Sequence, residues 1–135
     1  MEVTSNAIQT VNSDADVIFT DTTVGCRCGA ITNRPDSAII TLRGGARYFV
    51  NYGANIGLPT GATAGTIGIA LALQGEPLQT TQALHTAAAG EIYNVCRSKY
   101  IEVPRNCCYT LVLKNISSQE ITVSNANLIV ERMVG

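Results

Sequence analysis

Residues 47–56 constrain the fold more than any other segment, because their hydrophobic and polar residues alternate clearly. Successive side chains of a β-strand point to opposite faces, so this alternation predicts a strand with one buried face. A second alternating run covers residues 67–73, after a glycine-rich loop. No helix-period pattern persists beyond about two turns. The chain is therefore expected to be all-β.

The other β-rich runs are short and are separated by Gly, Asn, Asp and Pro, which favour turns. Residues 80–89 are expected to be loop or extended rather than helical, and the long strand is expected to bulge near Ser98. Eight to ten strands at hairpin spacing predict an antiparallel two-sheet jelly-roll sandwich. Besides 47–56 and 67–73, the expected strands are 7–11, 16–19, 37–42, 91–103, 109–115, 120–124 and 127–133.

The length of 135 residues suits a single core, and no linker or internal repeat divides the chain. We expect residues 17–135 to form the jelly-roll domain and the polar residues 1–16 to form a segment that anchors it to a larger assembly. The first six residues lack the basic start and apolar run of a signal peptide, so synthesis in the host cytoplasm without export is expected.

Charge is sparse, at 14% of residues against roughly 25% in an average soluble domain. Part of the surface is therefore expected to be hidden against partners. The net charge of −1 and the scattered basic residues argue against binding to nucleic acid or to an anionic membrane. The nine basic residues are Arg27, Arg34, Arg43, Arg47, Arg97, Lys99, Arg105, Lys114 and Arg132.

Three of the expected strands carry apolar residues at consecutive positions, and so on both of their faces. These positions are 48–50, 111–113 and 128–130. Such strands are buried on both sides, so we expect all three to lie in one sheet whose outer face packs on neighbouring subunits. The alternative is that a loop of the same chain covers them. The partner-facing residues are predicted to be Phe49, Val112 and Ile129. The opposite, core-facing set is Tyr48, Val50, Leu111, Leu113, Leu128 and Val130.

Four segments resemble the complement/tumour-necrosis-factor-like jelly rolls. Residues 45–52 resemble the glycine-led aromatic strand of that family, and residues 69–78 resemble its central hairpin. Residues 98–108, with residues 111–115, are similar to the strand pair before the last hairpin, and residues 121–130 are similar to the closing strands. The resemblance implies a homotrimer. Its vicinal-cysteine version is associated with short phage and prophage proteins, and related domains form the heads of collagen-like spore-surface proteins.

The five cysteines, an odd number in a chain without an export signal, are expected to be reduced thiols. The spacing of Cys26 and Cys28 and the adjacency of Cys107 and Cys108 do not match zinc knuckles, so small buried hydrophobic roles are favoured. An intersubunit disulfide through Cys26 or Cys28 is a minor hypothesis.

No motif indicates catalysis, a cofactor or a metal. Asp14, Asp16 and Asp21 lie close together, but no recognised calcium loop surrounds them, and aspartate is common in turns. His85 is the single histidine and has no nucleophile motif nearby. The chain is therefore expected not to be an enzyme.

These observations favour a non-enzymatic structural protein: a homotrimeric phage capsid decoration or head-fibre protein on the virion surface. Its expected partners are further copies of itself and the major capsid protein or another particle component. The alternative is a trimeric receptor- or glycan-binding head, an adhesin of a phage fibre or of a spore or cell surface.

Overall fold

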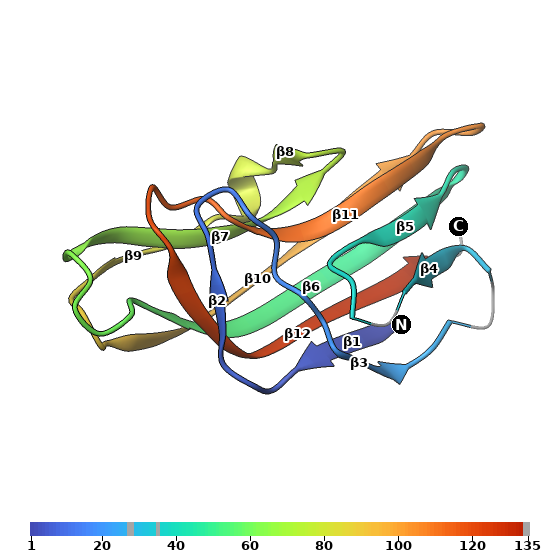
Figure 1. Ribbon diagram of the computed structural model, residues 1–135. Coiled ribbons are helices and arrows are strands. Elements are labelled where there is room, and N and C mark those ends of the chain that lie inside the picture. The colour runs from blue at the N-terminus through green and yellow to red at the C-terminus, as the bar shows by residue number, and fades with distance from the viewer. Residues whose placement is uncertain (27–28, 35, 134–135) are drawn as a thin grey trace.

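The alternating segment forms β6 (Ala46–Gly57), which lies within the first of two antiparallel sheets that pack face to face (Figure 1). The structure is a computed structural model that describes residues 1–26, 29–34 and 36–133. Sheet A has the order β10-β6-β12-β1-β3, with β2 also pairing with β12. Sheet B has the order β4-β5-β11-β7-β8, with β9 also pairing with β7. The predicted all-β, two-sheet jelly-roll sandwich is confirmed.

The described residues form twelve strands, more than the eight to ten expected. The other members of sheet A are β1 (Glu2–Ser5), β2 (Gln9–Val11), β3 (Asp21–Val24), β10 (Ile92–Val103) and β12 (Ile121–Met133). Sheet B consists of β4 (Ile31–Asn33), β5 (Ile40–Arg43), β7 (Gly65–Leu73), β8 (Glu76–Pro77), β9 (Ala83–Ala87) and β11 (Cys108–Asn115). A single 3-10 turn, η1 (Gln79–Thr81), is the one helical element of the described residues, and no helix among them is long enough to span a membrane.

The core lies between the two sheets and is built from the inward side chains of each. Tyr48 and Tyr52 of β6 are fully buried in it. Their hydroxyls donate to the carbonyl oxygens of Arg43 and Thr81, both at 2.6 Å. These bonds satisfy polar groups that would otherwise be costly to bury. Burial raises the pKa of both phenols above the ordinary value.

Several boundaries differ from the sequence prediction. The two closing strands are one strand, β12, interrupted by a register shift between Ser124 and Asn127, where Asn125 has a φ of 47°. The pairing of β10 with β6 is continuous from Ile92 to Val103, so the bulge expected near Ser98 is wrong. Residues 80–89 contain β9 and are largely extended, as expected.

The N-terminal segment is part of the sandwich. β1 lies between β12 and β3, β2 pairs with β12, and the Met1 ammonium donates to the Val130 carbonyl at 2.7 Å. The expected boundary at residue 16 therefore marks no structural division. An anchoring role for residues 1–16 stays a prediction.

The three doubly apolar strands do not share a sheet. β6 and β12 are neighbours in sheet A, whereas β11 pairs with β5 and β7 in sheet B. The expectation of a single sheet is therefore wrong. Apolar residues at both even and odd positions are typical of strands that are covered on both sides, but they do not identify the strands that pair with them.

Candidate interaction surface

The outer face of sheet A is formed mainly by β10, β6 and β12, which lie side by side (Figure 1). Residues directly opposite one another on paired strands share a face. Tyr100 of β10 is therefore aligned with Phe49 of β6, and Phe49 with Glu131 of β12. In the same way, Ser98 is aligned with Asn51 and Asn51 with Ile129.

Over most of the length of β10, β6 and β12, the residues whose side chains point outward are uncharged. We call this surface the uncharged face. Charged outward residues begin at its edge, with Glu131 beside Phe49 and the ion pair of Arg47 and Glu102 in the next row. The uncharged face consists of Ile92, Asn94, Cys96, Ser98, Tyr100, Phe49, Asn51, Gly53, Asn55, Gly57, Thr122, Ser124, Asn127 and Ile129.

An aromatic pair lies at one end of this face. The rings of Phe49 and Tyr100 have centroids 5.4 Å apart and are tilted by 54°, an arrangement that aromatic pairs favour. Phe49 is half-buried, whereas Tyr100 is 66% exposed. Two shallow hollows adjoin the pair, and both are lined by Tyr100 and Met133. An exposed aromatic ring beside hollows is a suitable contact for a partner.

The centre of the face is packed closely around a glycine. Gly53 lies between Cys96 of β10 and Asn127 of β12 in the strand register. A Cβ atom at position 53 would lie 2.9 Å from Oδ1 of Asn127, so the asparagine side chain leans over the glycine. Asn94 donates to the side-chain oxygen of Asn55 at 2.9 Å. The centre of the uncharged face is therefore polar but carries no charge.

The three predicted partner-facing residues are not brought together. Phe49 and Ile129 both point outward from sheet A and stay half-buried, whereas Val112 lies on sheet B with only 7% of its area exposed. The side chain of Val112 is therefore already buried within the single chain, which leaves little of its area for a partner. The core-facing set is buried as expected, and Phe49 and Ile129 keep area that a partner can cover.

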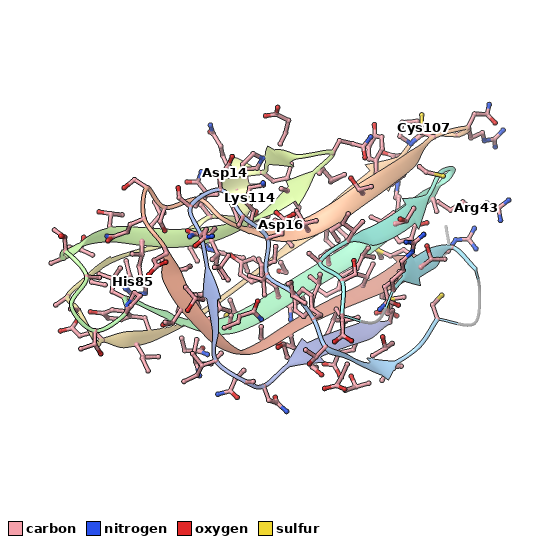
Figure 2. All side chains as sticks on the ribbon, viewed as in Figure 1. Asp14, Asp16, Arg43, His85, Cys107 and Lys114 are labelled. Atoms are coloured by element: carbon pink, nitrogen blue, oxygen red, sulfur yellow. The ribbon has the colours of Figure 1, made fainter. Side chains whose placement is uncertain are left out.

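Asp14 and Asp16, considered above as calcium ligands, face the ammonium group of Lys114 instead (Figure 2). Lys114 Nζ lies 3.3 Å from Asp16 Oδ1 and 3.7 Å from Asp14 Oδ1, and it donates to the Asp14 carbonyl at 3.0 Å. Asp21 lies in β3 of sheet A, away from this ion pair. The part of the chain that the structure describes holds no group of three or more His, Cys, Asp or Glu arranged for a metal.

The cysteines have different environments. Cys96 is an exposed free thiol on the uncharged face, and Cys107 and Cys108 are exposed free thiols at the turn between β10 and β11. Cys26 is disulfide-bonded, so the expectation of a reduced thiol is wrong there. Cys28 lies outside the described residues. The free thiols are not the small buried hydrophobic groups that the sequence suggested.

His85 forms part of a stacked cluster at the other end of β10. Its ring lies parallel to that of Tyr93, with centroids 4.4 Å apart, and the Tyr93 hydroxyl donates to the Glu91 carboxylate. This hydrogen bond lowers the pKa of Glu91 and raises the pKa of Tyr93. The cluster links β9 to β10 across the two sheets.

No protein-family profile matches the chain, and no curated protein is significantly similar to it in sequence. Among solved structures, rabbit GITRL shares 13% identity over 78% of each chain, with a TM-score of 0.46. A Podospora anserina GH26-CBM35 β-(1,4)-mannanase shares 11% identity over 96% of this chain and 29% of that chain, with a TM-score of 0.40. The CBM22-1–GH10 modules of Clostridium thermocellum xylanase 10B share 11% identity over 99% of this chain and 26% of that chain, with a TM-score of 0.34. These similarities are too distant to assign a function.

Proposed function

We propose that the protein is a non-enzymatic structural protein whose copies associate into a homotrimer through the uncharged face, and that the trimer decorates a phage capsid. The observation that carries the self-association is the uncharged face itself. Interface cores are depleted of charged residues and enriched in aromatic ones, and this face combines both properties in Phe49, Tyr100 and the outward residues around them.

The strand β10 supports a second copy of the chain as the occupant. Among the described residues β10 pairs with β6 alone, so it is the outermost strand of sheet A along its twelve residues. A long exposed edge strand invites uncontrolled pairing unless something covers it. In a closed ring, the β10 edge of one copy packs against the uncharged face of the next, and one contact covers both surfaces. The family resemblance favours three copies.

Two features support the role on a capsid. The segment that contains the adjacent Cys107 and Cys108 resembles the version of this jelly roll associated with short phage proteins, and an apolar loop is exposed near the N-terminus. Ile8, between β1 and β2, is 71% exposed. Ile18 is 46% exposed and lies nearby, because Gln9 bonds both its amide and its carbonyl. We assign Ile8, within residues 1–16, and the neighbouring Ile18 to the docking of this end of the chain on a major capsid protein.

Self-association is tested by light scattering on the purified chain. Wild type is expected at three times the chain mass of 14.3 kDa, about 43 kDa. Ser98→Arg places a charge in the uncharged face without removing a buried group, and is expected to give monomers. Ser118→Arg, in the exposed turn between β11 and β12, is the matched control and is expected to remain trimeric. A monomeric wild type at micromolar concentration would refute the trimer.

The capsid role requires that a phage genome encodes the chain. It is tested separately, on particles purified by density gradient from a lysate of that phage. Mass spectrometry is expected to find the chain with the major capsid protein, and Ile8→Glu is expected to remove it from particles while the trimer persists in solution. If the wild-type chain is absent from the particles, the capsid role fails, even where the trimer is confirmed.

The exposed ring of Tyr100 favours a second candidate, a glycan-binding head. Exposed aromatic rings offer an apolar body with a polar tip, which suits sugar rings. On a glycan array this candidate predicts competable signals that Tyr100→Ala abolishes. Burial of Tyr100 in the trimer predicts instead that the array stays blank.

A further inference from the structure

Arginines that are far apart in the sequence meet at one end of the sandwich. Arg47 at the start of β6, Arg105 in the turn after β10 and Arg132 near the end of β12 line one hollow. Arg43, at the end of β5, lines an adjoining hollow together with Arg132. These four arginines are a large share of the nine basic residues of the chain.

The strand register explains this convergence. Arg47 is directly opposite Glu102 on one side and Met133 on the other, so the ends of β10, β6 and β12 coincide. Arg132 is opposite Tyr48, whose side chain points into the core, so Arg132 lies on the inner side of β12 where the sandwich opens. Four of the basic residues scattered along the sequence thus line hollows at the same end of the sandwich.

The positive charge of this hollow is only partly balanced. Glu102 is the one carboxylate among its lining residues, and it pairs with Arg47 at 3.5 Å. Within the described residues, the guanidinium groups of Arg43, Arg105 and Arg132 form no ion pair. Several like charges held together repel one another unless an anion lies between them.

We propose that this hollow binds a single oxyanion group, a sulfate or a phosphate, held between Arg105 and Arg132. The planar guanidinium fork donates two parallel hydrogen bonds to such groups. The net charge of −1 and the flanking carboxylates of Glu102 and Glu131 exclude a long basic track of the kind that nucleic acids need. The site adjoins the charged edge of the uncharged face, since Met133 also lines the hollows beside Tyr100, and it is open to solvent at the end of the sandwich.

Sulfate and phosphate titrations, followed by NMR of the arginine Nε–Hε groups, test this site on the intact chain. Both anions are expected to shift the signals of Arg105 and Arg132 with saturation, whereas chloride at equal ionic strength does not. The double variant R105Q/R132Q is expected to weaken binding at least tenfold, on the order of two lost charge-assisted contacts. Thermal melting checks that the variants fold.

Two further variants separate a site from general charge screening. Arg97→Gln removes the same charge about 20 Å away along β10 and is expected to leave sulfate binding within about twofold of wild type. Glu102→Gln frees Arg47 and removes the opposing carboxylate, so it is expected to strengthen binding about threefold. The proposal is overturned if R105Q/R132Q binds sulfate like wild type, if R97Q is equally damaging, or if E102Q weakens binding.

A heparin hexasaccharide distinguishes the source of the anion. If the group belongs to a sulfated saccharide, the hexasaccharide is expected to bind more tightly than inorganic sulfate and to lose that advantage in R105Q/R132Q. If the site holds a free ion, the two probes bind alike per sulfate group. A hexasaccharide that shifts other residues but neither Arg105 nor Arg132 contradicts the proposed site.

Discussion

Phe49 and Tyr100 lie directly opposite each other on β6 and β10, with ring centroids 5.4 Å apart, although 51 positions separate them in the sequence. Their pairing places an aromatic surface at the end of a face that carries no charge. A side chain such as Tyr100, 66% exposed in the single chain, has most of its area available for burial by a partner.

Replacing Tyr100 by alanine is expected to weaken self-association by about 2 kcal/mol, or roughly thirtyfold in the dissociation constant. The reason is the loss of an aromatic contact near the proposed interface. Analytical ultracentrifugation over a dilution series measures the effect. Ile39→Ala, at a side chain that is 47% exposed and outside the uncharged face, serves as the control and is expected to associate like wild type.

The thiol of Cys96 reports burial of the uncharged face. In the assembled protein we expect Cys96 to react at least tenfold more slowly than Cys107 and Cys108 with a charged thiol reagent, because a partner covers it. Peptide mass spectrometry after timed labelling identifies each site. In Ser98→Arg, the rates of all three are expected to converge. Fast labelling of Cys96 in a particle that sediments as a trimer contradicts the assigned face.

The ion pair of Lys114 with Asp16 is expected to contribute to stability. Lys114 is mostly buried, and Asp16 Oδ1 is buried without a hydrogen bond, so removal of the ammonium leaves a poorly solvated carboxylate. Lys114→Met is expected to cost about 1–3 kcal/mol in the free energy of unfolding. Asp16→Asn in the same chain is expected to restore part of the loss. Urea denaturation of the double-mutant cycle measures this coupling.

Stability is expected to fall at alkaline pH because of Tyr48 and Tyr52. Burial raises the pKa of both phenols, so the fold favours their neutral form. The stabilisation is fully present below the unfolded pKa of about 10 and is lost as pH rises towards the folded values, with a limiting slope of about 1.4 kcal/mol per pH unit for each tyrosine. Tyr52→Phe is expected to flatten this decline, which denaturation between pH 9 and 12 measures. An unchanged slope in this variant contradicts the assignment.

The sequence predicted the long strands well, because their alternation is regular over many residues. β6, β7, β10 and β11 all begin and end within about three residues of the expected positions. The short strands β1, β3 and β4 were missed. The four residues of β3 are all exposed and the first three are polar, so pairing with β1, rather than any pattern of their own, makes them a strand.

The candidate surface was predicted only in part. Parity correctly places Phe49 and Ile129 outward, but Val112 was assigned to the same sheet because its strand has the same apolar pattern. Sheet membership depends on which strands pair, and that is decided by contacts between distant segments. The uncharged face had a usable signal, since the alternate positions of residues 92–100 contain no charged residue. The convergence of Arg47, Arg105 and Arg132 had none, because it arises only from the register.

The position of β12 has a consequence for biosynthesis. β12 lies between β6 and β1 in sheet A and also pairs with β2. During synthesis, β1, β2 and β6 therefore lack this common partner until residues 121–133 have left the ribosome. Closing contacts over such long separations is slow. The nascent chain therefore exposes the apolar side of β6 until residues 121–133 have been made, and chaperones are expected to protect that surface over this interval.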